Sequence, residues 1–377
     1  MDIQETLAQL VAIDSVSSRT NLRVIDYLAT RCEAIGLSVQ RFPYSDDNGI
    51  EKINLLAVAG ANLFGELDVE IVLVGHTDTV PYEATWTDAL NLTLRDEKLF
   101  GRGACDTKAF ISAALTAVQS LDLKSLRRPL ALLFTADEEV GLIGAQRFVQ
   151  QQQQMRARYA IVGEPTSLQP MRAGKGYCLA EITVQGREAH SAYPELGTSA
   201  VFGAARLITR IEKIATELRS EMHPDFDPPF TTLNIGLVHG GTAKNVVAGA
   251  CRFTLEWRPI PGQAPGRLLE LIDLAIATET ARDQHLIFEV EASRADQGFE
   301  TSANSKLVNL LEDLTMKTAG TVAFGTEAAL MTELGAEAVV LGPGNIREAH
   351  RTGEFVPVAE LDAGVEILRK AIETVCL

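Results

Sequence analysis

The chain has 377 residues, of which 46 % are hydrophobic and 22 % charged, and this composition excludes a disordered or fibrous protein. Fifty acidic residues against 34 basic ones give a formal net charge of −16. A field of that sign disfavours binding to nucleic acids and to anionic membrane surfaces, whereas it does not disfavour divalent cations. The length suggests two domains, or one domain with a large insertion.

The sequence also bears on location. No apolar run approaches the roughly 18 residues of a membrane helix, and the first residues lack the basic and apolar blocks of a signal peptide. Five cysteines without a CxxC pair are too few for a disulfide framework and do not favour a thiolate zinc site. We therefore expect a cytoplasmic protein without a membrane partner.

Outside the middle of the chain, helical patterns alternate with short runs that are apolar on both faces. The predicted helices are Asp2–Ile13, Leu22–Ile35, Thr107–Leu121 and Val358–Val375. The apolar runs are Ile71–Val74, Leu130–Phe134, Tyr159–Val162 and Ala338–Leu341. Such runs are typical of central strands in a sheet that is covered on both sides, so we predict an α/β domain with a mostly parallel central sheet.

The middle of the chain has a different pattern. Residues Cys251–Arg258 alternate strictly between apolar and polar, which is typical of an antiparallel strand with one face in water. The neighbouring predictions are strands at Tyr177–Val184, Leu233–Val238 and Leu286–Val290 and helices at Thr198–Leu218 and Arg267–Thr278. Their order, β-α-β-β-α-β, is that of a ferredoxin-like unit. We therefore predict that residues 172–294 form an α+β domain inserted between two parts of the α/β domain, residues 1–171 and 295–377.

Potential metal ligands follow the predicted central strands, and ligands of open α/β sheets bind beyond the carboxyl ends of the strands. In chain order these residues are His76 and Asp78, then Glu138 and Glu139, then Glu164 and, after a loop, His350. Asp106 lies at the predicted N-cap of the helix that begins at Thr107. Each residue alone has a simpler reading, such as a hydrogen-bonded histidine, a solvated acidic pair or a helix cap. Their joint placement favours a pair of divalent ions with one bridging carboxylate.

The spacing of these residues suggests roles. Residues i and i+2 of an extended segment share a face, so Asp78 is expected to orient the imidazole of His76. The neighbouring side chains of Glu138 and Glu139 point in different directions, so one can bind metal while the other acts as general base toward a water molecule. We assign the base to Glu138, although spacing alone also permits the reverse order.

These motifs resemble the di-zinc aminoacylase/carboxypeptidase family of co-catalytic metallopeptidases. The segments that carry the resemblance are His76–Asp78, Gly101–Asp106, Asp137–Glu139, Gly163–Thr166 and His350, and they extend over nearly the whole chain. The resemblance implies two divalent metal ions, zinc first and cobalt or manganese as alternatives. It implies the following roles: His76 and Glu164 on one ion, Glu139 and His350 on the other, Asp106 as the bridge, Glu138 as the base and Asp78 behind His76.

The resemblance also covers the inserted domain, which it implies to be a lid that forms a homodimer. The segment around His190 resembles a motif whose histidine reaches the active site of the other subunit and donates to the tetrahedral oxyanion. Asn245 and Arg258 resemble a clamp for the substrate carboxylate, for which a guanidinium is well suited. Lys175 is a weaker candidate for the same role. Without the resemblance, His190 would be read as closing a strand end and Arg258 as a surface residue.

Three segments bear on the substrate, which the family implies to be an N-acyl amino acid. Glu164–Pro170, Gly325–Ala328 and Leu341–Ile346 are most similar to the branch that hydrolyses N-acetyl-L-ornithine to L-ornithine and acetate in arginine biosynthesis. Glu327 would pair with the δ-ammonium of ornithine, or would simply be an N-terminal helix residue that the dipole favours. One departure is Arg351–Glu354, a looser version of the usual acidic segment after the last histidine.

Other functions remain open from the sequence. The same mechanism would serve an N-acetylcitrulline deacetylase, a succinyl-diaminopimelate desuccinylase, a general aminoacylase or a dipeptidase. A non-catalytic protein that binds metal or amino acids is the alternative from another class, since fold alone does not decide activity. The unligated carboxylate of Glu138 argues against it, because a binding protein has no need of a base beside the water.

Overall fold

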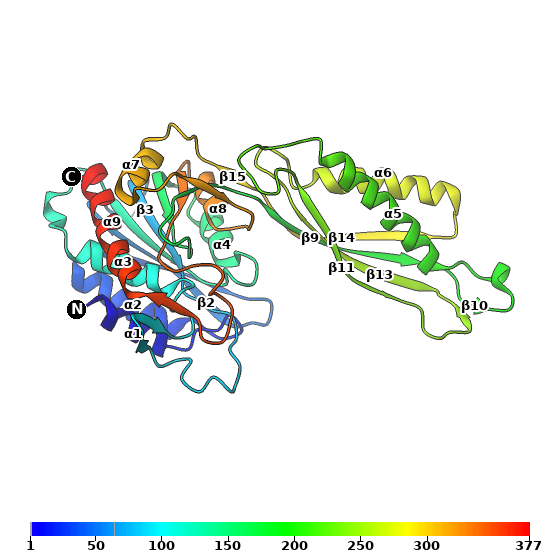
Figure 1. The fold of residues 1–377 in the computed structure, drawn as a ribbon, viewed down its shortest axis with the longest axis horizontal. Coiled ribbons are helices and arrows are strands. Elements are labelled where there is room, and N and C mark those ends of the chain that lie inside the picture. Colours follow the sequence, from blue (N-terminus) through cyan, green and yellow to red (C-terminus); the bar gives the residue numbers. More distant parts are fainter. Residues whose placement is uncertain (1, 64) are drawn as a thin grey trace. The chain divides into compact units, whose positions relative to one another are not determined.

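The computed structural model describes residues 2–63 and 65–377 (Figure 1). They divide into two compact units. The first unit comprises Met1–Ala173, Glu300–Gly320 and Thr326–Leu377, and the second comprises Gly174–Phe299 and Thr321–Gly325. Met1, the first residue of the predicted segment 1–171, lies outside the described residues. The second unit reaches beyond residue 294 because β14 (Ile287–Asp296) continues past the predicted strand end at Val290.

The first unit is built on a mixed sheet with the strand order β1-β2-β6-β3-β7-β17-β8. These strands are β1 (Ser38–Ser45), β2 (Glu51–Ala59), β3 (Leu67–His76), β6 (Leu130–Thr135), β7 (Met155–Val162), β8 (Met171–Gly174) and β17 (Glu337–Val340). The four central strands β6, β3, β7 and β17 are parallel, and the outer strands pair antiparallel. The predicted mostly parallel central sheet is confirmed.

Shorter strands lie at the margins of this unit. Two of them, β15 (Phe299–Glu300) and β16 (Gly320–Val322), complete the main sheet where the chain passes between the units. Three more form a small separate sheet, β4 (Thr93–Arg95), β5 (Lys98–Phe100) and β18 (Phe355–Pro357).

Helices cover both faces of the main sheet (Figure 1). One group consists of α1 (Ile3–Ala12), α2 (Leu22–Ile35), α3 (Lys108–Gln119) and α9 (Val358–Cys376), and the other of α4 (Ile143–Gln151) and α8 (Ala328–Glu333). Helix α7 (Lys306–Thr315) packs against α9, and a short 3-10 helix, η1 (Leu123–Ser125), follows α3. Helix α3 contacts α1, α9 and β3, so nearly all of its side chains are buried, including the predicted stripe from Phe110 to Val118.

The second unit is an antiparallel sheet with two helices on one face (Figure 1). Its elements are β9 (Tyr177–Gln185), α5 (Ala200–Leu218), β11 (Thr232–Gly240), β13 (Ala250–Arg258), α6 (Arg267–Arg282) and β14, with the strand order β11-β13-β9-β14. Along β13 the side chains of Cys251, Phe253, Leu255 and Trp257 are buried, as the alternation predicted. The ferredoxin-like order is confirmed. A small ribbon of β10 (Ala189–His190) and β12 (Val246–Val247) and the 3-10 helix η2 (Pro194–Leu196) complete the unit.

The elements of the first unit that were not predicted from the sequence include β1, β2, β8, α4, α7 and α8. Strand β2 is almost entirely buried, yet Lys52 and Asn54 interrupt its apolar pattern. None of the helices in the described part of the chain combines the length and apolarity that a membrane crossing requires.

Candidate metal centre and active site

The register of three parallel strands brings the predicted ligands to one edge of the sheet. His76, the last residue of β3, pairs with Thr135 of β6, and Val74 pairs with Val162 of β7. Because the strands are parallel and aligned, the residues that follow them emerge at the same edge. These residues are Glu138 and Glu139 after β6 and Glu164 after β7.

Two glycines allow helix α3 to lie directly against these strand ends. A Cβ on Gly163, just after β7, would lie 2.2 Å from the ring of Phe110, and a Cβ on Gly75 would lie 2.9 Å from Ile111. Any larger residue would push α3 away from the sheet. The close approach matters because Asp106 lies immediately before this helix.

Asp106 lies between the two histidines. Its Oδ1 is 3.0 Å from Nε2 of His76, and its Oδ2 is 3.2 Å from Nε2 of His350. The other carboxylate at His350 is that of Glu139, at 3.0 Å. One carboxylate that presents one oxygen to each imidazole is the arrangement expected of a bridging ligand. The donor atoms of His76, Asp106 and Glu139 lie within 4.8 Å of one another, close enough to share a cation.

The electrostatics of the cluster fit divalent cations. Burial and the neighbouring carboxylates raise the pKa of Glu164, which is only 5 % exposed, well above its ordinary value. Burial likewise raises the pKa values of Glu138 and Glu139. Hydrogen bonds to Asp106 and Glu139 raise the pKa of His350 to about 10. In the metal-free protein, bound protons therefore offset the negative charge of the carboxylates. Cations at the same place would replace those protons, and imidazole with carboxylate is a donor set that transition metals bind.

The prediction that Asp106 caps α3 is wrong by one residue. The N-cap is Thr107, and Asp106 precedes it. The loop before the helix wraps around the buried carboxylate of Glu354 instead. That carboxylate accepts hydrogen bonds from Nη1 of Arg102 at 2.6 Å and from the backbone N–H groups of Cys105 at 2.8 Å and Asp106 at 3.0 Å. Because Glu354 holds the loop, the Asp106 side chain is left to face the two imidazoles.

Asp78 lies behind His76, but its carboxylate does more than the spacing predicted. The closest acceptor for Nδ1 of His76 is the backbone oxygen of Asp78 at 3.1 Å, and the carboxylate is 3.6 Å away. The carboxylate accepts from the hydroxyl of Ser17 at 2.7 Å and from the backbone N–H groups of Glu138 at 3.1 Å and Glu139 at 3.3 Å. Although burial opposes it, the nearby imidazole of His76 and the hydrogen bond from Ser17 lower the pKa of Asp78. One carboxylate thus fixes both the histidine and the Glu138–Glu139 turn.

A second buried group supports the same turn. Asp137, whose φ is 56°, forms a buried ion pair with Lys52 and accepts from the hydroxyl of Tyr44 at 2.8 Å. Lys52 also donates to the backbone oxygen of Ser17. Sequence reasoning missed Lys52 and Glu354. A lysine inside an apolar run and a carboxylate shortly after the last histidine were the available signals.

Glu327, the predicted partner of the substrate ammonium, is buried in the first unit and only 1 % exposed. Neither of its carboxylate oxygens has a hydrogen-bond partner among the described residues. Burial raises its pKa to about 7, against the opposing effect of His76. A buried carboxylate without a partner is costly, so it points to a function or to a bound cationic group.

The remaining predicted residues belong to the second unit. His190 is exposed, and its Nδ1 accepts from the backbone N–H of Ala192 at 3.0 Å. Across the ribbon His190 pairs with Val246. Asn245, the residue before Val246, accepts a hydrogen bond at its backbone oxygen from the N–H of Ser191 at 3.0 Å. Because Nδ1 of His190 is an acceptor, its neutral ring carries the proton on Nε2.

Arg258 and Lys175, the two cationic candidates for binding the substrate carboxylate, differ in their contacts and exposure. Nε of Arg258 donates to Glu256 at 2.8 Å, and its guanidinium lies over the ring of Tyr177. The ammonium of Lys175 donates to the backbone oxygens of Pro228 at 2.8 Å and Phe230 at 2.7 Å, and the residue is 1 % exposed. These internal bonds explain the burial of Lys175 without any substrate.

Comparison with known proteins agrees with this geometry. The family model described as peptidase family M20/M25/M40 matches residues 72–374, and the chain belongs to this family. It is therefore an enzyme of a hydrolase family, as the motifs implied. Among its relatives, a protein of Myxococcus xanthus named acetylornithine deacetylase is 50 % identical over 376 residues, which cover 99 % of this chain and 97 % of the relative.

Two further similarities extend over comparable lengths. An acetylornithine deacetylase of Proteus mirabilis (strain HI4320) is 35 % identical over 99 % of this chain and 96 % of its own length. The crystal structure of a tripeptidase from Staphylococcus aureus has a TM-score of 0.79 at 23 % identity and covers 99 % of this chain and 97 % of its own. At that identity the tripeptidase supports the fold alone.

Proposed function

We propose that this protein hydrolyses N-acetyl-L-ornithine to L-ornithine and acetate, a reaction of arginine biosynthesis. The observation that carries the proposal is the complete set of candidate metal ligands around Glu138. The set is His76, Asp106, Glu139, Glu164 and His350. The Glu138 carboxylate is not needed as a ligand, so it can act as the general base. The choice of substrate is supported by the relative named acetylornithine deacetylase, which is 50 % identical over nearly the full length.

The proposed cofactor is a pair of divalent ions. His76 and Glu164 would hold one ion and Glu139 and His350 the other, with Asp106 between them. Zinc is the first choice for this donor set, and cobalt and manganese are alternatives. When bound, such a pair polarises the acyl oxygen and increases the acidity of a water molecule between the ions.

Glu138 is the proposed general base. It takes a proton from the attacking water and later gives this proton to the leaving amine. Burial and the neighbouring carboxylates raise its pKa, which favours holding the proton between the two steps. The hydrogen bonds from the backbone N–H groups of Glu138 and Glu139 to Asp78 fix the turn, so that the base does not drift toward the ligand position.

The second unit is proposed to be a lid and dimerisation domain. His190 suits oxyanion stabilisation because it is exposed and its Nε2 carries the proton. In the described part of the chain Arg258 bonds to Glu256 through Nε, which leaves its terminal N–H groups available for a substrate carboxylate. Asn245, which precedes the ribbon strand β12 and bonds to the neighbour of His190, Ser191, would add an amide donor. The homodimer and the cytoplasmic location stay predictions.

The test is amine release from N-acetylornithine, N-acetylcitrulline, N-acetylmethionine and N-succinyl-diaminopimelate. The protein is assayed after chelation and again after zinc or cobalt has been restored. We expect release only with metal, and fastest from N-acetylornithine. Faster metal-dependent release from another substrate would reject the specificity and keep the site, whereas no release from metal-loaded protein would reject the enzyme.

A further inference from the structure

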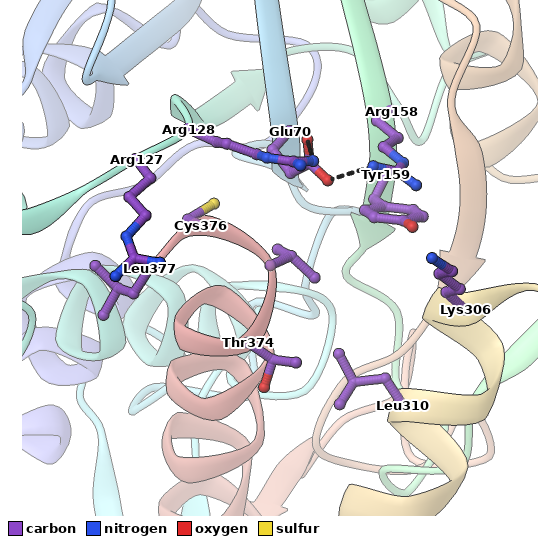
Figure 2. Close-up of a pocket in the computed structure, with 11 residues that line it drawn as sticks. Glu70, Arg127, Arg128, Arg158, Tyr159, Lys306, Leu310, Thr374, Cys376 and Leu377 are labelled. Carbon is purple, nitrogen blue, oxygen red and sulfur yellow. Dashed lines mark hydrogen bonds and ion pairs between the residues drawn. The ribbon is translucent and has the colours of Figure 1, made fainter.

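A pocket lies in the first unit, away from the candidate metal ligands. It is a cavity of about 390 Å³ lined by side chains from β3, β7, α7, α9 and the segment before β6 (Figure 2). Glu70 precedes Ile71, which pairs with both Leu130, the first residue of β6, and Tyr159 of β7. The pocket therefore lies toward the amino ends of the strands, whereas the candidate metal ligands follow the carboxyl ends.

The pocket is cationic in a strongly acidic chain. Four of its side chains are basic, Arg127, Arg128, Arg158 and Lys306, and Glu70 is its one acidic side chain. The chain as a whole carries a formal net charge of −16. Basic side chains that gather in one concavity of such a protein create a local field that attracts anions.

Glu70 arranges two of the arginines. Its Oε2 is 2.7 Å from Nη1 of Arg128, and its Oε1 is 3.0 Å from Nη1 of Arg158 (Figure 2). One carboxylate between two guanidinium groups leaves a net positive charge and several free N–H donors. Because Glu70 is 9 % exposed and belongs to a central strand, it holds both guanidinium groups at the pocket wall.

The other two cations have no acidic partner among the described residues. The backbone N–H of Arg127 donates to the backbone oxygen of Cys376 at 2.9 Å. Within the described residues, neither the guanidinium of Arg127 nor the ammonium of Lys306 forms an ion pair, whereas Arg128 and Arg158 do. Glu70 offsets only part of the charge of the four basic side chains, all of which are exposed, so the pocket keeps a net positive charge. An anion in the pocket would neutralise that charge.

We propose that this pocket binds a small organic anion with at least two negative charges, either a phosphate monoester or a polycarboxylate. The forked donors of the arginines suit oxyanions, and the lysine adds a point charge. Apolar lining from Tyr159 and Leu310 gives room for a carbon framework beside the charged groups. The site is independent of the proposed catalytic function, since none of its residues is a candidate ligand or base.

The experiment is calorimetric titration of the full-length, metal-loaded protein at fixed ionic strength, without substrate. The probes are inorganic phosphate, phenyl phosphate and tricarballylate, each added to the wild type and to the Arg127→Gln/Lys306→Gln variant. Both residues are exposed, so the variant should fold, which thermal unfolding checks. We expect one site per chain for at least one organic probe and an affinity at least tenfold lower in the variant.

A matched control removes two exposed cations elsewhere, Arg23→Gln/Lys213→Gln, and is expected to stay within twofold of the wild type. The organic probe that binds more tightly identifies the ligand as phosphate ester or polycarboxylate. The inference is overturned if no probe binds, if both double variants weaken binding equally, or if Arg127→Gln/Lys306→Gln binds as the wild type does. Anion binding at the metal centre would give that last result.

Discussion

At the scale of single residues, Glu138 and Glu139 are chemically identical neighbours with different surroundings. Glu139 lies 3.0 Å from His350, whereas Glu138 has no hydrogen-bonded side chain among the described residues and is held only through its backbone. We expect Glu138→Gln to lower kcat by about 10²–10⁴, the usual contribution of a general base, while the metal content stays unchanged. Glu139→Gln should instead lose metal. Elemental analysis with steady-state kinetics separates the two, and a fully active Glu138→Gln would contradict the assignment.

Glu327 is predicted to set specificity. Its buried carboxylate lacks a hydrogen-bond partner among the described residues, so an ammonium group of the substrate would supply the missing charge. Glu327→Gln should reduce kcat/KM for N-acetylornithine about tenfold more than that for N-acetylmethionine, which has no ammonium group. Glu333→Gln, an exposed change at the other end of α8, serves as control. Equal losses on both substrates would reject the role.

Glu354 is predicted to position Asp106. Its carboxylate receives Arg102 and three backbone N–H groups, so the buried charge is fully satisfied only in this loop conformation. Glu354→Gln should destabilise the protein by about 3 kcal/mol, because it leaves Arg102 buried without its partner. Glu348→Gln, which breaks a surface ion pair with Arg351, should cost less than about 1 kcal/mol. Denaturant unfolding compares the two, and similar losses would argue against a special role for Glu354.

The site residues differ in how far they could be predicted. His76, Glu138, Glu139 and Glu164 directly follow apolar strands, so a local pattern indicates them. Glu354 acts on a loop about 250 residues earlier, and no local pattern reports such a partner. The same holds for Lys52 and Asp137, which meet only when β2 and the turn after β6 come together.

At the scale of elements, one buried ion cluster joins the two helices of the second unit. Glu279 of α6, buried at its side chain, accepts from Nε of Arg206 at 2.7 Å and of Arg210 at 2.6 Å, both one turn apart on α5. Although burial opposes it, these hydrogen bonds lower the pKa of Glu279. A lowered carboxyl pKa stabilises the fold above the unfolded value, near pH 4.3, and this contribution is lost as pH falls below it.

We therefore expect Glu279→Gln to destabilise the protein by about 2–3 kcal/mol at neutral pH and by less below pH 4. The exposed Glu270→Gln on the same helix should have little effect at either pH. Thermal unfolding of the three proteins at pH 7 and pH 3.5 measures the difference. A penalty that does not shrink in acid would show that the ion cluster is not its cause.

Helices and strands were predicted correctly where the hydrophobic residues follow a single clear period along the segment. Helix α2 was predicted with its observed bounds, Leu22–Ile35, because Gly36 adopts the left-handed conformation that ends a helix. Strand β2 was missed because Lys52 and Asn54 point inward from an otherwise apolar run, and their partners lie far away in sequence. Helix α4 has a short amphipathic pattern of nine residues, too little to establish a period.

At the scale of the whole molecule, the two units carry different candidate residues. All predicted metal ligands and Glu138 lie in the first unit, and His190, Asn245 and Arg258 lie in the second. The chain leaves and re-enters the first unit at adjacent strands, since the N–H of Thr301 donates to the oxygen of Arg172 at 2.8 Å. A short glycine-serine linker can therefore replace residues 174–299.

This deletion variant should keep its metal and lose at least about 10² in kcat/KM for N-acetylornithine, because the oxyanion and carboxylate donors are absent. Metal analysis and the amine-release assay test it, and visible absorption spectroscopy of the cobalt-loaded variant confirms the site. Full activity of the variant would reject the proposed lid role.

The first unit is formed by segments before and after the second unit in the sequence, and this has a consequence for its folding during translation. Strand β17, which lies between β7 and β8, and the candidate ligand His350 are both translated after Gly325, the last residue of the second unit. During that interval β7 has an unpaired edge, and nascent edges of this kind are prone to pair with other chains. The second unit can fold early, while the first must wait for its last strand. A chain that ends before residue 350 would therefore combine a folded second unit with a candidate metal site that lacks one of its histidines.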